Sequence, residues 1–317
     1  MENRKEKFCM DVAFYRFFSR KYPLSVTRRT FFHGHEVAYH NHDFPQVWYC
    51  LDGRYDHRVA DRIYPCRKGS LVIIPPGVYH DFTVPDDSVA DCVFLNVKYD
   101  FFLNKPMEMY VNSVANLFLP RFSQELDYEF PEFVTLSGES RATAEKLLSQ
   151  LSAIDFLEPE DAYAQMYPAL ERFFSVPELA FPEQARESAL QLAQTYVQTM
   201  ATVLSYINQN FRKKLLSREC WKISNICRTN FFKIFQRYLG CTYSQYLQML
   251  RVRCAWMYIT NTTCSLADIS DLCGFSDQSA MNNCFRRYLF RSPREEREIR
   301  LKYLNDHPDL RLHIQEE

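Results

Sequence analysis

The sequence predicts an α+β protein with an N-terminal antiparallel β-barrel or sandwich, a helical connecting region and an all-α C-terminal domain made of two similar units. Three observations lead to this prediction. Residues 25–100 hold short runs of valine, isoleucine, tyrosine and phenylalanine separated by turn signals. From about residue 105, apolar residues recur at helical spacing. Between residues 206 and 300, a polar start followed by Phe-x-Arg-Tyr-Leu and a turn occurs twice.

Length and composition bound the class of protein. The 317 residues suggest two domains, and an apolar content of 47% with 15% aromatics is that of a globular chain. Apolar runs are interrupted within a few residues, so we expect no helix that spans a bilayer and no membrane partner. The charged N-terminal segment lacks the apolar stretch of an export signal, and the 11 cysteines form no Cys-x-x-Cys pair. We therefore expect a cytoplasmic protein with reduced thiols.

The net charge of −1 conceals two parts of opposite sign. Residues 211–317 hold 18 Lys and Arg against 11 Asp and Glu, whereas residues 1–210 hold 20 against 28. A basic C-terminal third beside an acidic body is expected of a protein that binds a polyanion there. Chance clustering on a solvated face gives the same balance, so charge alone leaves both interpretations open.

Four turn signals divide the β-rich block. Lys68–Gly69, Pro76–Gly77 and Pro85–Asp87 separate short apolar runs. Asp52–Gly53 is a hairpin signal. Turns at such short spacing are typical of an antiparallel barrel or sandwich, so we place this domain over residues 1–105.

The block that follows, residues 106–199, is predicted to consist of helices that connect the two domains. A long helix is expected near residues 183–209. It suits two roles, dimerisation or capping of the barrel, and we expect a homodimer. The prolines that limit or kink the helices of this block are Pro159, Pro168, Pro177 and Pro182.

The stretch that begins at Ser265 predicts a helix-turn-helix. Ser265 with Asp268 forms a box-like cap for the first helix. Gly274 stands where that helix must end, because glycine adopts the left-handed conformation at the least cost. Phe275 then joins the turn to the core, and Ser276 begins the second helix.

The second helix of this unit has an apolar and a polar face. Met281, Phe285 and Leu289 recur at four-residue steps and are predicted to face inward. The amide, hydroxyl and guanidinium groups of the other face suit the base edges and phosphates of DNA. The residues predicted to face outward are Gln278, Ser279, Asn282, Asn283 and Arg286. A helical hairpin with a polar solvent face has the same pattern, so the pattern alone leaves DNA binding open.

The stretch SLADISDLCGFSDQSAMNNCFRRYLFRSPREER resembles the C-terminal signature of AraC/XylS-type transcription regulators. The matching positions are Leu266, Ile269, Gly274, Phe275, Ser279, Phe285, Arg286, Arg287, Ser292, Pro293 and Arg297. The departures are Ser270, Ala280, Met281, Phe290, where the family has glycine, and Glu296, where it has tyrosine. The resemblance implies a DNA-binding domain over residues 200–300, followed by a tail at 301–317. Its two recognition helices would enter successive major grooves of promoter DNA.

The first helix-turn-helix unit matches the family less closely. Arg251 and Ala255 fit the family's linker helix, and Phe231 and Phe235 fit the core of the first recognition helix, which Gly240 ends. The departures are Cys220 and Trp221, where the family prefers Leu-Ala. The residues of this unit predicted to contact DNA are Thr229, Phe232, Lys233 and Arg237. Arg287 joins Arg237 and Arg286 as a predicted phosphate contact.

HGHEVAYHNHDFPQVWYCLDG and GSLVIIPPGVYHDF together resemble the cupin-type sensor domain that is common in this family. His40, His42 and His80 match the cupin histidines, whereas Gln46 stands where metal-binding cupins have glutamate. A neutral amide is a poor metal ligand. An effector pocket, a metal site and a structural role stay open. We favour an effector pocket with no metal or cofactor, formed by His40, His42, Gln46, Trp48 and His80.

The resemblance implies a sequence-specific transcription regulator and no enzymatic activity. Its barrel would sense a small-molecule effector, its C-terminal domain would bind promoter DNA, and RNA polymerase would be a further partner. A metal-dependent cupin enzyme using iron at His40, His42 and His80 is one alternative, against which Gln46 and the DNA-binding units count. A protein–protein adaptor whose helix-turn-helix units have lost DNA contact is the other, which the departures from the signature keep open.

Overall fold

The computed structural model describes residues 23–99, 101–102, 105–154 and 157–306. The N-terminal segment, for which we expect no export signal, and residues 307–317 of the expected tail lie outside the described residues. The chain divides into two compact units. Of the described residues, the N-terminal unit holds 23–202 and 234–240, and the C-terminal unit holds 203–233 and 241–306.

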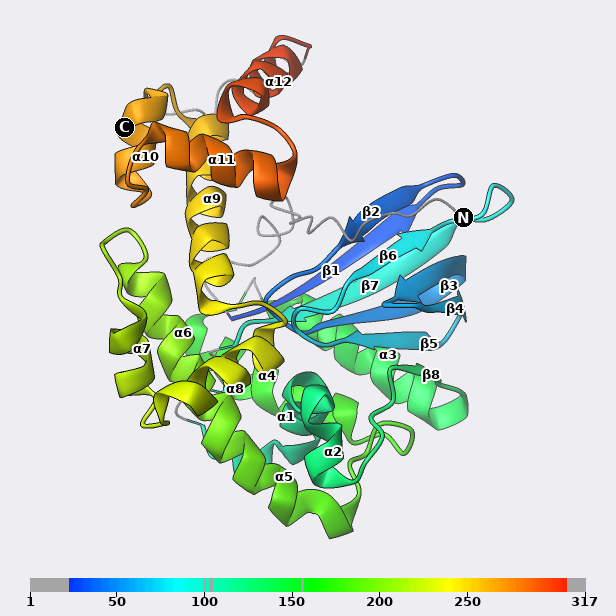
Figure 1. Cartoon of the computed structure of the whole chain (residues 1–317). Coiled ribbons are helices and arrows are strands. Elements are labelled where there is room, and N and C mark those ends of the chain that lie inside the picture. Colours follow the sequence, from blue (N-terminus) through cyan, green and yellow to red (C-terminus); the bar gives the residue numbers. More distant parts are fainter. Residues whose placement is uncertain (1–22, 100, 103–104, 155–156, 307–317) are drawn as a thin grey trace. The chain divides into compact units, whose positions relative to one another are not determined.

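The β-rich block forms antiparallel strands that all connect through one long strand. The strands are β1 Leu24–Phe31, β2 Glu36–His40, β3 Gln46–Val59, β4 Arg62–Arg67, β5 Ser70–Ile74, β6 His80–Thr83, β7 Ala90–Val97 and β8 Phe133–Thr135 (Figure 1). The first half of β3 pairs with β5 and β7, and its second half pairs with β4 and β6. β1 pairs with β7, β2 with β6 and β8 with β5. Together with the helical C-terminal region, this confirms the predicted α+β class.

One predicted turn is wrong. β3 continues through Asp52–Gly53, with a register shift between Cys50 and Asp52. Gly53 has a φ of +79°, and a Cβ atom there would lie 1.7 Å from the carbonyl oxygen of Val89. The glycine therefore permits a β-bulge in close contact with a neighbouring segment, where we had expected a hairpin. The chain reverses later, at Ala60–Asp61, between β3 and β4.

Side chains from both halves of β3 and from its neighbours meet in one apolar core. The ring of Trp48 lies 4.7 Å from that of Phe82 and 4.9 Å from that of Phe94. His57 is 0% exposed, with its ring 5.3 Å from Trp48. Within the described residues neither nitrogen of the His57 ring has a hydrogen-bond partner. Burial lowers the pKa of His57 to about 3, so the ring is neutral.

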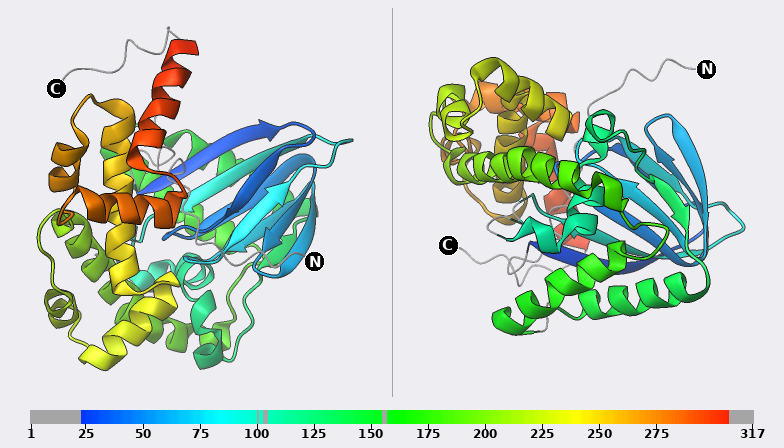
Figure 2. Two further views of the ribbon diagram at one scale, coloured as in Figure 1. Left: turned by 45° about the horizontal axis from the view of Figure 1, so that its top comes forward. Right: turned by 90° about the horizontal axis from the view of Figure 1, so that it is seen from below.

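Helices follow the strands within the N-terminal unit. They are α1 Val111–Phe118, α2 Ser123–Leu126, α3 Gly138–Ser152, α4 Pro159–Phe174 and α5 Arg186–Leu192, and α6 Gln198–Asn210 begins in this unit and continues into the C-terminal unit. α3 and α4 pack against each other, and α3 also contacts β1 (Figure 2). Pro159 opens α4 and Pro168 lies inside it. The long helix predicted near 183–209 is present as α5, a π-helical segment at Ala193–Val197 and α6.

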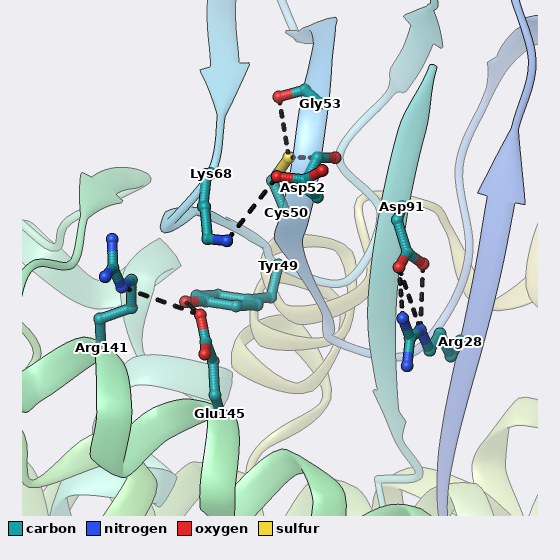
Figure 3. Close-up of polar contacts among 9 residues, drawn as sticks. All are labelled: Arg28, Tyr49, Cys50, Asp52, Gly53, Lys68, Asp91, Arg141 and Glu145. Atoms are coloured by element: carbon teal, nitrogen blue, oxygen red, sulfur yellow. Dashed lines mark hydrogen bonds and ion pairs between the residues drawn. The ribbon is translucent and has the colours of Figure 1, made fainter.

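Polar contacts join a helix to a strand and one strand to another in this unit. The hydroxyl of Tyr49 on β3 donates to Oε1 of Glu145 on α3 at 3.0 Å (Figure 3). Arg141 lies one turn away on α3, with its Nε 4.0 Å from the same oxygen. Between β1 and β7, Nε of Arg28 donates to both carboxylate oxygens of Asp91 at 3.1 Å.

The rest of the chain is helical. The helices are α7 Ser217–Ile223, α8 Arg228–Leu239, α9 Tyr243–Asn261, α10 Leu266–Leu272, α11 Gln278–Leu289 and α12 Pro293–Asp306. α10, α11 and α12 all contact α9 and gather around one end of it (Figure 1). No helix in the described ranges is long and apolar enough to cross a membrane.

The predicted recognition helices, α8 and α11, end in the same way. α8 is followed by Gly240 with a φ of +69°, and α11 by Phe290 with a φ of +57°. A capping box then begins the next helix in each case, with Thr242 and Gln245 before α9 and with Ser292 and Glu295 before α12. Phe290 therefore adopts, with a full side chain, the left-handed conformation that glycine adopts at the end of α8.

We predict that Phe290→Gly stabilises the C-terminal unit by about 1 kcal/mol, because a left-handed conformation costs a residue with a side chain roughly that much. Urea unfolding followed by tryptophan fluorescence measures the gain. Phe290→Ala is the matched control, since it removes the half-exposed ring but keeps the cost of the conformation. An equal gain in both variants would assign the effect to the ring and contradict the prediction.

The neutral burial of His57 predicts a pH dependence of stability. Between pH 6.5 and about 3 the unfolded chain binds a proton at this histidine that the folded chain does not bind. The free energy of unfolding therefore falls as the pH is lowered through this window. His57→Leu should reduce the slope by at most about 1.4 kcal/mol per pH unit, measured by urea unfolding at pH 7.5 and pH 5. His33→Leu, at an exposed position, is the control. An unchanged slope in His57→Leu would refute the neutral burial of His57.

Candidate functional site

The second helix-turn-helix forms through short-range contacts that the sequence predicts well. Oγ of Ser265 accepts a hydrogen bond from the backbone N–H of Asp268 at 3.1 Å and caps α10. Gly274 has a φ of +78° in the turn, as predicted. The start of α11 is corrected by one residue. Asp277, and not Ser276, is the cap, because its Oδ1 accepts from the N–H of Ala280 at 2.7 Å.

α11 separates its residues into a buried and an exposed face. Met281 and Phe285 are both 0% exposed, as expected. Tyr288 is buried, whereas Leu289 is only partly buried, so the inward position predicted for Leu289 is wrong. The predicted DNA-contacting residues of α11 that are exposed are Gln278, Ser279, Asn283, Arg286 and Arg287, and Asn282 is partly exposed. One exposed surface thus holds amide, hydroxyl and guanidinium groups.

α9 holds this unit in place through polar contacts. The hydroxyl of Tyr288 donates to Oε1 of Gln248 at 2.8 Å, and Arg287 donates to the same oxygen at 3.3 Å. Nε1 of Trp256 donates to Oε2 of Glu296 at 3.1 Å, which gives a role to the glutamate that stands where the family has tyrosine. Among the predicted phosphate contacts, Arg287 therefore has an intramolecular acceptor.

In the first unit, α8 presents two of its predicted DNA-contacting residues to solvent. Thr229 and Lys233 are exposed. Phe232 is partly exposed, and its ring lies 5.2 Å from that of the buried Phe231 in an edge-to-face arrangement. An aromatic ring in this position has one edge in the core and one toward solvent.

Arg237, near the end of α8, has partners within the N-terminal unit, to which residues 234–240 belong. Its Nε donates to the carbonyl oxygen of Arg121 at 2.8 Å, and its guanidinium pairs with the carboxylate of Glu125. The guanidinium also lies over the ring of Phe122, 4.6 Å from its centroid. The hydrogen bond from Arg237 lowers the pKa of Glu125. The guanidinium of Arg237, which we expected to contact a DNA phosphate, is paired in this structure with the carboxylate of Glu125.

The barrel brings the three predicted histidines together in its interior. The ring centroids of His40 and His80 lie 4.2 Å apart, and those of His42 and His80 lie 4.9 Å apart. Nδ1 of His42 faces the carbonyl oxygen of Phe44 at 2.5 Å, and Nδ1 of His80 faces that of Val78 at 3.3 Å. A carbonyl only accepts, so each Nδ1 carries the proton. Burial lowers the pKa of His42 to about 3 and that of His80 well below its usual value, so both rings are neutral.

Gln46 and Trp48 lie beside these histidines and belong to a chain of hydrogen bonds across three strands. Nε1 of Trp48 donates to Oε1 of Gln46 at 2.5 Å. Nε2 of Gln46 donates to Oδ1 of Asn96 at 2.7 Å, and Asn96 donates to Oγ of Ser25 at 3.2 Å. Both ends of the Gln46 amide are therefore bonded within the barrel.

His57 is a member of this site that sequence reasoning missed. Its ring lies 5.7 Å from that of His80. The signal was present in β3, where Tyr55, His57 and Val59 alternate and all three are buried. Within the described ranges, no group of three or more His, Cys, Asp or Glu side chains is placed so as to hold a metal ion.

Two parts of the chain match known domain families. Residues 23–103 match the AraC-like ligand binding domain, and residues 222–299 match a helix-turn-helix domain. The first match covers strands β1 to β7, and the second covers α8 to α11 with parts of α7 and α12.

Relatives and solved structures agree with these matches. The HTH-type transcriptional activator RhaR of Mannheimia succiniciproducens is 22% identical, over 89% of this chain and 94% of that protein. The probable transcriptional regulator LumQ of Photobacterium leiognathi is 24% identical, over 81% of this chain and 90% of that protein. ToxT from Vibrio cholerae bound to an unsaturated fatty acid has a similar fold, with a TM-score of 0.51 and 12% identity over 86% of this chain and 94% of that chain. With a ligand-binding domain ahead of a helix-turn-helix domain, and with transcriptional regulators as relatives over most of its length, the chain belongs to the AraC-type transcription regulators.

Proposed function

We propose that this regulator reads promoter DNA chiefly through the exposed face of α11, while α8 enters the neighbouring major groove. The observation that carries the proposal is the placement of Gln278, Asn283 and Arg286 on one exposed face above buried Met281 and Phe285. Amide side chains bond adenine in two places, and guanidinium groups bond guanine or phosphate. Ser279 and Asn282 belong to the same proposed surface, and Thr229, Phe232 and Lys233 form its counterpart on α8.

The phosphate contacts are proposed to be unequal. Arg286 has an exposed side chain and is our primary phosphate contact. Arg287 shares Gln248 with Tyr288, and Arg237 pairs with Glu125, so each must exchange a partner to reach DNA. We keep both as secondary contacts.

The effector is proposed to bind in the barrel beside His40, His42, Gln46, His57 and His80. Both ring nitrogens of His57 and the Nε2 of His80 are buried without a hydrogen-bond partner in the described structure. Buried polar atoms of this kind are costly unless a ligand or water satisfies them. Neutral imidazoles suit a small molecule with a hydroxyl or amide group, and the apolar surroundings to which Trp48 contributes suit the rest of such a molecule.

The remaining proposals concern activity and assembly. We propose a cytoplasmic homodimer that contacts RNA polymerase and has no enzymatic activity. The regulators among its relatives support this view, and so does the bonded amide of Gln46, which is not free to complete a metal site. The domain limits proposed are those of the sequence, with the sensor at 1–105, the connecting region at 106–199, the DNA-binding domain at 200–300 and the tail at 301–317.

Selection of bound duplexes from a random DNA pool tests the function directly. A regulator enriches one sequence with two half-sites about one helical turn apart. Repeating the selection with small-molecule extract tests the effector, since a ligand that favours one state changes the enrichment. A pool that stays random under both conditions would favour the adaptor alternative.

Gln278→Ala and Asn283→Ala should each weaken binding to the selected site by about 1–3 kcal/mol, because each removes contacts to base edges. Binding to random duplex should change little, which fluorescence anisotropy with both duplexes measures. Gln209→Ala, an exposed amide on α6, is the matched control. Equal losses on both duplexes would contradict base reading by α11.

Arg286→Gln should lower the slope of log Kd against log salt by about 1, because one phosphate contact releases roughly one counterion. A titration from 50 to 300 mM salt measures the slope on the selected duplex. Arg294→Gln, an exposed arginine of α12 paired with Glu298, is the control and should leave the slope unchanged. The phosphate role of Arg286 is refuted if its variant keeps the full slope.

A further inference from the structure

Three segments of the C-terminal unit meet at the turn of the second helix-turn-helix. Nε of Arg251 on α9 donates to the carbonyl oxygen of Phe211 at 2.9 Å, and its NH2 group donates to that of Lys213 at 3.0 Å. Arg212 lies between these two carbonyls and packs against the turn at Gly274. A Cβ atom on Gly274 would lie 2.5 Å from the carbonyl oxygen of Arg212. The turn therefore packs directly on Arg212, with no space for a side chain at Gly274.

Two cysteines lie in this junction. Cys254 is partly exposed on α9, and Cys273, which directly precedes Gly274, is 0% exposed. The two thiols are close enough for each to affect the pKa of the other. The guanidinium of Arg212 donates to the sulfur of Cys254 at 3.7 Å. Cys254 thus has both a thiol and a cation beside it.

These neighbours make the two thiols chemically different. The interaction with Cys273 and the positive charge of Arg212 lower the pKa of Cys254 to about 7. The pKa of Cys273 is raised instead, by the interaction with Cys254 and by burial. At neutral pH a large fraction of Cys254 is therefore thiolate, and Cys273 stays a thiol. Reactive cysteines are stabilised as thiolates and are accessible to solvent, and Cys254 has both properties.

We propose that Cys254 and Cys273 form a redox site, which a hydroperoxide converts to a disulfide and which thereby weakens DNA binding by α11. The consequence for DNA rests on the proposed function, whereas the thiol chemistry does not.

The chemistry proceeds in two balanced steps. The thiolate of Cys254 attacks one oxygen of the hydroperoxide, the O–O bond breaks, and the alkoxide or hydroxide that leaves takes a proton from water. Cys254 is then a sulfenic acid, oxidised by two electrons. The sulfur of Cys273 attacks the sulfur of Cys254, the S–O bond breaks, and hydroxide leaves with the Cys273 proton as water. The net change is two thiols and one hydroperoxide to one disulfide, one alcohol or water, and one water.

A second pair of neighbouring thiols shows what distinguishes this site. Cys50 and Cys92 lie opposite each other on β3 and β7 in the barrel, and both are 0% exposed. The Cys50 sulfur bonds backbone carbonyl oxygens, so no cation donates to it in the contacts described. The pair at the helix-turn-helix differs from the barrel pair in two ways. Cys254 is partly exposed, and the guanidinium of Arg212 donates to its sulfur.

A disulfide at this position displaces α11 for a geometric reason. It holds its sulfur atoms about 2.05 Å apart, closer than any hydrogen-bonded pair. Cys273 must then approach α9, but Gly274 beside it already touches the Arg212 carbonyl. α11 begins at Gln278, a few residues later, so the start of the recognition helix moves with the turn.

Mass spectrometry of the full reduced chain treated with hydrogen peroxide tests the site. We expect a loss of two hydrogens and a link between Cys254 and Cys273. Cleavage at aspartate separates the two cysteines, because Asp268 and Asp271 lie between them. Cys273→Ser should instead accumulate a sulfenic acid at Cys254, which dimedone traps. Cys264→Ser is the matched control, a partly exposed cysteine near Cys254, and should form the link as the wild type does.

The rate of oxidation gives the decisive comparison. Cys254→Ser should consume peroxide about tenfold more slowly than the wild type, since it lacks the stabilised thiolate. Arg212→Gln, which keeps both cysteines, should also consume peroxide more slowly than the wild type. The redox site is refuted if Cys254→Ser and the wild type react at the same rate, or if no link joins residues 254 and 273.

DNA binding by the linked protein tests the consequence. On the selected duplex, oxidation should raise Kd by about tenfold or more, with recovery on addition of dithiothreitol. The same treatment of Cys273→Ser should leave Kd within about twofold of its reduced value. An unchanged Kd in fully linked protein overturns the effect on α11. Failure of the reduced protein to select any duplex would refute the proposed function instead, and the mass measurement would still decide the redox site.

Discussion

The two bonds from Arg251 to the backbone carbonyls of Phe211 and Lys213 are the constraint on which the C-terminal unit depends. These carbonyls follow the end of α6 and lack partners of their own in a helix, so the guanidinium satisfies them and fixes the entry to the first helix-turn-helix. The same helix, α9, holds the second helix-turn-helix through Gln248 and Trp256. α9 thus holds both the segment that leads into the first helix-turn-helix and the helices of the second.

The barrel has its own organising contacts. Trp48, Gln46 and Asn96 bond in sequence across β3 and β7, which gives these three buried side chains polar partners within the sheets. His57 and His80 differ, because their free ring nitrogens face the interior. Buried polar atoms without a partner also occur elsewhere among the described residues, at Asn116, Tyr238 and Ser270, but at His57 and His80 three of them lie close together in the matched ligand domain. This contrast is the physical basis for placing the effector there.

Features with a local cause were predictable from the sequence. The Ser265 cap and the Gly274 turn follow from the needs of a helix end, and the outward face of α11 follows from helical spacing. Small errors came from the same rules. Four-residue steps drift from the true period of about 3.6 residues, so Tyr288 takes the buried place predicted for Leu289. Asp277 caps α11 better than Ser276, although both residue types are suited to the task.

Features that depend on distant parts of the chain were not predictable. Nothing near Arg237 in the sequence indicates that Glu125 pairs with it, and nothing near Cys254 indicates Arg212. His57 was missed because a histidine inside an alternating strand matches no motif, and its partners come from another strand. Phe290 stands where the family has glycine, and the sequence did not indicate that this residue would adopt the left-handed conformation.

The bulge at Gly53 has a consequence for how genetic variation in this chain is interpreted. A methyl group at that position would overlap the carbonyl oxygen of Val89, so every missense change at this codon forces the β-sheet apart. Gly53 contacts neither of the surfaces assigned to DNA or effector. A survey of variants for loss of regulation would nevertheless rank it among the least tolerant positions, and intolerance there reports a steric limit of the sheet and carries no information on ligand recognition.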